Sequence, residues 1–171
     1  RPPGSQAEVD FLATCARCGL CMKSCPTNVI QPRVAGGITE IFTPELDFSL
    51  AHCEFTCAAC GTVCPTGAIE KLPLHIKQRF VIGKAVIDRN RCIPWVKGHD
   101  CIVCQELCPV SDKAIVLEER EASSILPDAE PGTTVKLPYV VEGRCIGCGI
   151  CENNCPATGG AAIVVLPIEK G

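Results

Sequence analysis

Sixteen of the 171 residues are cysteines, and they form four groups of four with nearly the same spacing. The last three cysteines of each group follow the pattern C-x2-C-x3-C-P, and only the distance to the first cysteine varies. Numbered as motifs 1 to 4 along the chain, the groups are Cys15, Cys18, Cys21 and Cys25; Cys53, Cys57, Cys60 and Cys64; Cys92, Cys101, Cys104 and Cys108; and Cys145, Cys148, Cys151 and Cys155. Such self-similarity indicates an internal repeat.

This spacing is typical of the ligands of cubane [4Fe–4S] clusters. Three cysteines in C-x2-C-x2-C order bind three corners of one cluster, and the fourth, followed by proline, binds a neighbouring cluster. We therefore predict that all sixteen cysteines are metal ligands and that the chain holds four [4Fe–4S] clusters. Such clusters carry single electrons, so we expect an electron carrier with no catalytic residues of its own.

Three other interpretations of the cysteines fit less well. A disulfide scaffold agrees with the cysteine content, but thiols at i, i+3 and i+6 have few well-placed partners. Structural zinc favours separated C-x2-C pairs, which a third cysteine and a recurring Cys-Pro do not match. The spacing Cys53-x3-Cys57-x2-Cys60 is that of the radical-SAM motif, but Cys64 completes an ordinary group of four.

The composition excludes several classes of protein. A net charge of −3 without any run of five like charges gives no indication of nucleic-acid binding. The longest apolar runs, such as residues 161–167, are too short to span a membrane directly. Cluster binding would make the protein more acidic, which suits a basic docking face on a redox protein partner.

The 15 glycines and 14 prolines predict short elements joined by many turns. We expect strands at 84–88, 114–118, 139–142 and 161–165, short helices at 8–12, 73–80 and 151–155, and loops at 31–50 and 119–138. The predicted fold class is α+β, with two interlocked bacterial-ferredoxin-like modules. We expect one four-cluster domain over 1–171, with a linker at 1–10 and motifs at 15–26, 53–65, 92–109 and 145–156.

Other side chains are expected to surround the clusters. An apolar residue follows each Cys-Pro and is expected to pack on a cluster and exclude water: Val29 and Ile30, Ile69, Ile115, and Ile163. Trp95, in the long spacer of motif 3, either shields a cluster or packs within its loop. We expect surface or packing roles for the three histidines, which are His52, His75 and His99.

The motifs resemble those of bacterial two-cluster ferredoxins, doubled. A closer resemblance is to four-cluster ferredoxins of the NapG/MauM type and to the iron–sulfur subunits of molybdenum oxidoreductases. It is carried by the opening Arg1-Pro2-Pro3-Gly4, by residues 11–21, by the stretched motif 3, and by the ending at 64–69. Motif 2 departs from it, because three residues separate Cys53 from Cys57 where a longer spacer is expected in the nitrate-reductase members.

The resemblance implies an extracytoplasmic protein at the outer face of the cytoplasmic membrane or in the periplasm, although a cytoplasmic location stays open. It implies partners such as a quinol-oxidising membrane subunit, a cytochrome or a molybdenum enzyme, in a membrane-associated respiratory complex. Because the chain begins at Arg1, we expect that a leader or longer N-terminal region is missing from this sequence. Two alternative functions stay open. The chain is either an enzyme subunit that contributes to a substrate site or a mainly structural cluster module.

The four motifs can exchange their last cysteines in two ways. In a tandem arrangement motif 1 pairs with 2 and motif 3 with 4, whereas in a nested arrangement motif 1 pairs with 4 and motif 2 with 3. The nested pairing is favoured by the likeness of the two outer motifs and by the resemblance to molybdenum-enzyme subunits. Its clusters would be bound by Cys15/Cys18/Cys21/Cys155, Cys145/Cys148/Cys151/Cys25, Cys53/Cys57/Cys60/Cys108 and Cys92/Cys101/Cys104/Cys64.

Overall fold

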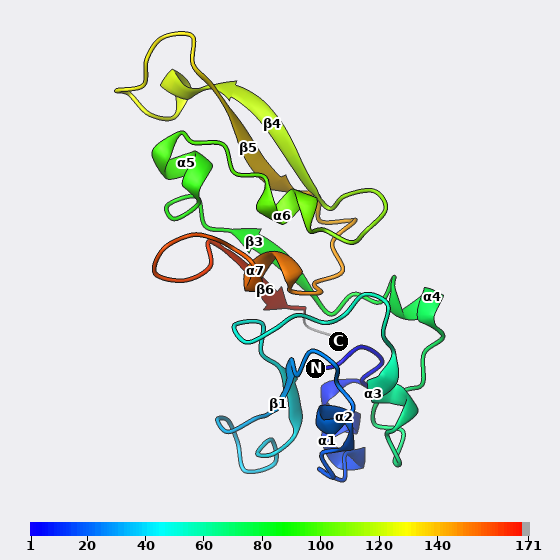
Figure 1. Ribbon diagram of the computed structural model, residues 1–171. Coiled ribbons are helices and arrows are strands. Elements are labelled where there is room, and N and C mark those ends of the chain that lie inside the picture. The colour runs from blue at the N-terminus through cyan, green and yellow to red at the C-terminus, as the bar shows by residue number, and fades with distance from the viewer. Residues whose placement is uncertain (169–171) are drawn as a thin grey trace. The chain divides into compact units, whose positions relative to one another are not determined.

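The chain forms two compact units in a computed structural model that describes residues 1–168. Unit 1 comprises Arg1–Gly83 together with residues 167–168, and unit 2 comprises Lys84–Leu166. Motifs 1 and 2 therefore lie in unit 1, and motifs 3 and 4 lie in unit 2. Both units are built from short helices and short strands (Figure 1).

Unit 1 contains four short helices and one small sheet. Its elements are α1 (Glu8–Thr14), α2 (Leu20–Lys23), β1 (Ile30–Pro32), β2 (Pro44–Leu46), α3 (Ala59–Thr62) and α4 (Leu74–Lys77). Strand β1 pairs antiparallel with β2, so that Ile30 faces Leu46. The core is formed by Phe11, Val29, Ile30, Ala68 and Ile69 together with Cys21 and Cys60. The cysteines are therefore part of the core.

The opening residues pack onto the end of motif 2. Pro2, Pro3, Gly4 and Ser5 are buried, and Ser5 forms an isolated antiparallel bridge with Ile69. The linker expected at 1–10 is thus a packed segment that continues into α1. Prolines suit this role, because their fixed φ stabilises an extended segment laid against the protein.

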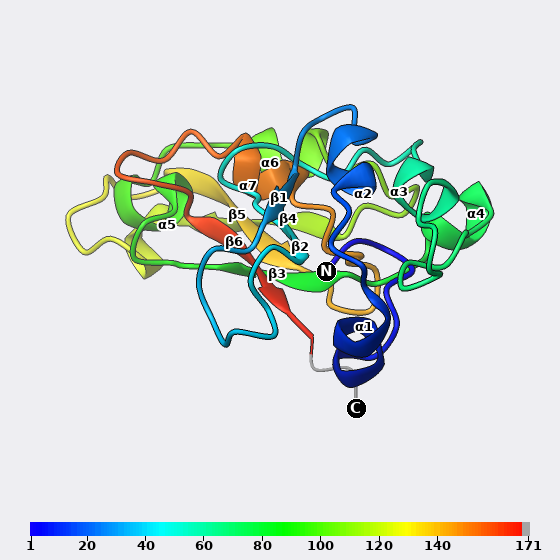
Figure 2. The same cartoon turned by 90° about the horizontal axis from the view of Figure 1, so that it is seen from below.

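Unit 2 contains a small sheet and a long hairpin. Its elements are β3 (Gly83–Ile87), α5 (Ile93–Lys97), α6 (Val103–Glu106), β4 (Ile115–Glu121), the 3-10 helix η1 (Ala122–Ser124), β5 (Thr134–Val140), α7 (Ile150–Asn153) and β6 (Ile163–Pro167). Strand β3 pairs with β6. Strands β4 and β5 pair antiparallel from Ile115–Val140 to Glu121–Thr134 and lie side by side in both views (Figures 1 and 2).

The expectation of a loop at 119–138 was wrong at both ends, because β4 and β5 extend into this range. In the first strand of this hairpin, residues 118–121 are polar and exposed, so the sequence shows no alternation of apolar and polar residues there. On the opposite arm Val135 and Leu137 are buried with Ala122 in a small core at the far end of the hairpin.

Most other expected elements are confirmed within two to three residues. Strands occur at the expected places near 84–88, 114–118 and 161–165, and the helix at 8–12 extends to Thr14. The helix expected at 73–80 is shorter, and the expected loop at 31–50 contains most of the small β1–β2 sheet. The mixture of short helices and strands agrees with a small α+β ferredoxin-like fold. That two modules interlock stays a prediction.

Candidate metal centres

Four hollows in the protein are each lined by four cysteines. Each hollow takes the first three cysteines of one motif and the last cysteine of another. Numbered by the motif that supplies three, they are site 1 (Cys15, Cys18, Cys21, Cys64), site 2 (Cys53, Cys57, Cys60, Cys25), site 3 (Cys92, Cys101, Cys104, Cys155) and site 4 (Cys145, Cys148, Cys151, Cys108). All sixteen predicted ligands are thus brought together in groups of four.

The exchange of cysteines takes place between neighbouring motifs. Sites 1 and 2 both lie in unit 1, and sites 3 and 4 both lie in unit 2. The nested pairing was therefore wrong, and the tandem pairing is the one that the structure has. The reason is a contact between elements: α2 packs against α3 within unit 1, and α6 packs against α7 within unit 2. Each motif's last cysteine follows its helix and so reaches the hollow beside the partner helix.

Short helices fix the third cysteine of every motif. Cys21, Cys60, Cys104 and Cys151 lie in α2, α3, α6 and α7, respectively. In motifs 1 and 4 a glycine in the left-handed region precedes the helix, with φ of 74° at Gly19 and 80° at Gly149. A residue without a Cβ adopts this conformation at little cost. This explains the Cys-Gly-x-Cys sequence of the two outer motifs.

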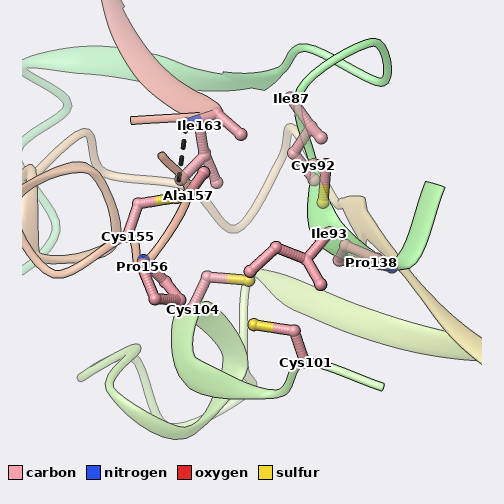
Figure 3. A pocket seen from close by; sticks show the side chains of 11 residues that line it. Ile87, Cys92, Ile93, Cys101, Cys104, Pro138, Cys155, Pro156, Ala157 and Ile163 are labelled. Atoms are coloured by element: carbon pink, nitrogen blue, oxygen red, sulfur yellow. Dashed lines mark hydrogen bonds between the residues drawn. The ribbon is translucent and has the colours of Figure 1, made fainter. Parts of the chain in front are cut away.

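The hollows fit a multi-iron cluster better than a single ion. Within residues 1–168, no group of three or more His, Cys, Asp or Glu side chains is close enough to hold one metal ion. The sulfurs of a tetrahedral zinc site lie only about 3.8 Å apart, given Zn–S bonds of about 2.3 Å. Four sulfurs spread around a wider hollow match the corners of a cubane. In site 3 the cysteine side chains surround a common space (Figure 3).

The walls of the hollows are apolar, as expected. The residues after each Cys-Pro line the same hollow as the cysteine that they follow: Val29 and Ile30 at site 2, Ile69 at site 1, Ile115 at site 4, and Ile163 at site 3. Their side chains are buried. They therefore limit the access of water to the sulfurs, which is one of the factors that set the potential of a cluster.

Backbone amides donate hydrogen bonds to one sulfur at every site. The donors lie at 3.4 Å for Ala59 to Cys57, 3.4 Å for Ile69 to Cys64, 3.4 Å for Ala85 to Cys145, and 3.2 Å for Ala162 to Cys155. The last of these bonds is the dashed line in Figure 3. Such bonds favour a negatively charged sulfur.

Burial opposes that negative charge at other ligands. It raises the pKa of Cys21 and Cys92 to about 11 and that of Cys60 and Cys104 to about 12, and it raises the pKa of Cys151 further. A thiolate is costly in these positions unless a metal ion supplies compensating charge. The chemistry of the donor set therefore calls for metal at each hollow.

Lys77 is a residue near these sites that the sequence analysis missed. It lies at the end of α4 with only 2% of its surface exposed, and its ammonium donates to the Glu54 carbonyl oxygen beside Cys53. Nothing in the sequence distinguishes it from other lysines, because its position depends on how α4 folds back against motif 2.

Trp95 packs within unit 2 away from site 3. Its ring lies edge-on to Tyr139 at 5.6 Å, and the Arg89 guanidinium lies 4.3 Å from its centroid. It also contacts the small core of the hairpin, and it does not line site 3. Of the two interpretations left open, packing within the loop is therefore the right one.

Two four-cysteine hollows per unit, with the last cysteine exchanged between motifs, define a ferredoxin-type iron–sulfur protein. Comparison with known proteins agrees. The family described as 4Fe-4S dicluster domain matches residues 14–68, and the 4Fe-4S binding domain family matches residues 136–157.

Curated relatives extend the match to the whole chain. The methylamine utilization ferredoxin-type protein MauM of Methylorubrum extorquens is 35% identical over 173 residues, which cover 100% of this chain and 74% of the relative. The MauM protein of Paracoccus denitrificans is 34% identical, with 100% and 72% covered. The ferredoxin-type protein NapG of Escherichia coli is 32% identical, with 99% and 71% covered. The chain belongs to the NapG/MauM-type ferredoxins.

A solved structure also matches, but weakly. It is a chain of a formate dehydrogenase–heterodisulfide reductase–formylmethanofuran dehydrogenase complex from Methanospirillum hungatei, with 20% identity and a TM-score of 0.31 over 98% of this chain and 54% of that chain. Separately, none of the helices described in residues 1–168 has the length and hydropathy of a membrane-spanning segment.

Proposed function

We propose that this iron–sulfur electron carrier binds four [4Fe–4S] clusters, one at each site, and relays electrons between redox protein partners. The observation that supports it most strongly is the grouping of all sixteen cysteines into four separate hollows. A bound cluster supplies reversible uptake of one electron. The thiolates act as fixed ligands, and we propose no substrate-binding or catalytic residue.

The surroundings of the sulfurs control how easily each site is reduced. Apolar walls such as Ile69 and Ile163 exclude water, and amide donors such as Ala162 stabilise added negative charge. Potentials of such clusters span from about −700 to +450 mV, depending on these surroundings.

Exchange of cysteines between sites 1 and 2 connects the two sites through the residues between Cys21 and Cys25 and between Cys60 and Cys64.

The partners and the location belong to the same proposal. We propose a quinol-oxidising membrane subunit, a cytochrome or a molybdenum enzyme as redox partner, within a membrane-associated respiratory complex and on the extracytoplasmic side. The names of the relatives, ferredoxin-type proteins of methylamine utilization and of the NapG type, support a role in a redox system.

The test is a reductive titration of the full chain without oxygen, followed by electron paramagnetic resonance. We expect uptake of about four electrons per chain, one for each cluster, with spectra of pairs of coupled clusters. Adding small organic substrates should leave the spectra unchanged. Uptake of no electrons would overturn the proposal, and a spectrum perturbed by a substrate would favour the enzyme-subunit alternative.

A further inference from the structure

Lys77 is the only charged side chain that is buried among residues 1–168. The other buried polar side chains, Ser5 and Thr43, carry no charge. A lysine is almost never fully buried unless its ammonium is paired. The position of this charge is therefore a feature that calls for an explanation.

The ammonium of Lys77 lies against motif 2. It donates to the carbonyl oxygen of Glu54, a residue that lines site 2 and directly follows the ligand Cys53. Burial raises the pKa of the Cys53 thiol, and the nearby charge of Lys77 opposes that rise. In the described part of the chain no carboxylate lies within ion-pairing distance of it. Its hydrogen-bond partner is thus a carbonyl dipole next to a predicted cluster ligand.

The other three sites have no such neighbour. Arg17 lines site 1, but its guanidinium is exposed and donates to the carbonyl oxygens of Thr39 and Ile41. No lysine or arginine lines site 3 or site 4. Lys113 donates to the carbonyl oxygens of Glu106 and Cys108 beside site 4, but its side chain is only half-buried. Site 2 is therefore distinguished by a buried positive charge next to one of its sulfurs.

We propose that Lys77 gives site 2 the highest reduction potential of the four, so that an electron entering the protein settles there. This inference deepens the proposed function and depends on it, since it requires a cluster at site 2. Reduction adds one negative charge to the cluster and its four thiolates. A cation in a region of low dielectric constant stabilises the more negative state more than the less negative one.

The route of the electron follows from the same unit. Cys18 at site 1 is the one exposed cysteine of the sixteen, so a redox protein partner can approach site 1 most closely. The partner gives up one electron and site 1 gains it. With clusters bound, site 1 would then pass the electron to site 2, with which it exchanges Cys25 and Cys64. No proton and no bond change is required in either step.

A second neighbour of site 2 has a smaller effect. The Thr27 hydroxyl lies 3.5 Å from the Cys25 sulfur, but it donates its hydrogen to the His52 carbonyl oxygen at 2.7 Å. A hydroxyl has a single hydrogen to donate. Its hydrogen is therefore not available to the Cys25 sulfur, and the buried charge of Lys77 is the larger influence on site 2.

The experiment compares Lys77→Met with Lys71→Met by redox titration of the fully loaded chain. Met replaces the buried lysine with an apolar side chain of similar length, and Lys71 is an exposed lysine of the same unit. We expect one of the four clusters of the unmodified protein to be reduced first. That cluster alone should shift to lower potential in Lys77→Met, whereas Lys77→Arg and Lys71→Met should keep the original order.

Iron and sulfide content distinguishes the ways in which this can fail. Full loading with unchanged potentials in Lys77→Met would overturn the role of Lys77, while the proposed function would stand. If Lys77→Met does not bind clusters, the redox titration of the unmodified protein still tests the inference. Four clusters of equal potential in that titration would contradict it. Absence of iron and sulfide from the unmodified chain would instead overturn the proposed function.

Discussion

The last cysteine of a motif differs from the three before it in what surrounds its sulfur. Burial raises the pKa of Cys25 and Cys64, but hydrogen bonds from the amides that follow the proline, joined at Cys64 by the Thr66 hydroxyl, outweigh it, so that the pKa of each is lowered. The third cysteines, such as Cys21 and Cys60, have raised pKa values because burial dominates there. The exchanged cysteines of unit 1 are therefore better prepared to carry negative charge than Cys21 and Cys60.

Replacing Thr66 by valine should lower the reduction potential of site 1. The hydroxyl lies 3.7 Å from the Cys64 sulfur and supports the charge added on reduction. A hydrogen bond contributes about 0.5 to 1.5 kcal/mol, which corresponds to roughly 20 to 60 mV for one electron. Protein-film voltammetry measures the shift. The matched control is Thr62→Val, because the Thr62 hydroxyl donates to a helix carbonyl instead. Equal shifts in the two variants would contradict this role of Thr66.

At the scale of the residue, the sequence predicted which side chains gather around the hollows. All sixteen cysteines line the four hollows, as do the apolar residues after each Cys-Pro. These features depend on local spacing, which the chemistry of a cubane restricts. Lys77 could not be predicted in the same way, because its burial depends on a contact with Glu54, 23 residues away in the sequence.

At the scale of the element, short helices lie very close to the chain around them. Gly61 in α3 follows Cys60, and a Cβ at this position would lie 2.2 Å from the carbonyl oxygen of Glu70. This oxygen belongs to the backbone, so it cannot move aside without displacing the segment after motif 2. The close approach of α3 to that segment positions Cys60 at site 2.

Gly61→Ala should therefore destabilise site 2 by about 1 to 3 kcal/mol or more. Because proteins with tightly bound metal centres do not unfold in a two-state manner, the measurement is the rate of cluster loss on heating, followed by visible absorbance. We expect faster loss from Gly61→Ala. Gly37→Ala is the control, since a Cβ there meets only side chains, at 3.8 Å or more, and it should behave as the unmodified protein. Similar rates of cluster loss for the two variants would show that the close approach of α3 to Glu70 does not restrict the residue at position 61.

Contacts between elements determine which motifs exchange their last cysteines, and the sequence alone did not show this. The outer motifs resemble each other, and this likeness favoured a nested pairing, whereas the packing of α2 on α3 and of α6 on α7 produces the tandem one. Similar sequences indicate similar loops but not which loops are neighbours. The β4–β5 hairpin was missed for a related reason: residues 118–121 are all charged and exposed, so they show no alternation of apolar and polar residues.

At the scale of the whole molecule, each unit holds two of the four-cysteine hollows. Since no site draws cysteines from both units, each unit contains a complete ligand set. Folding of a unit and binding of its two clusters are then coupled, because metal binding supplies folding free energy to a site that does not exist in the unfolded chain.

The tandem pairing predicts which single substitutions are equivalent. Cys15→Ala and Cys64→Ala should perturb the same cluster, and Cys25→Ala and Cys53→Ala should perturb the other cluster of unit 1. In all four variants the spectra of unit 2 should persist. Electron paramagnetic resonance of the reduced variants makes the comparison. The nested pairing predicts instead that Cys15→Ala resembles Cys155→Ala, and that outcome would contradict the structure.

The central claim is that the sixteen cysteines bind four [4Fe–4S] clusters. Its most direct test is the quantification of iron, acid-labile sulfide and zinc in the full chain purified without oxygen. The structure predicts about 16 irons and about 16 sulfides per chain, four of each for every cluster. About four zinc ions per chain with no sulfide would contradict the claim, since each group of four thiolates would then hold a single ion.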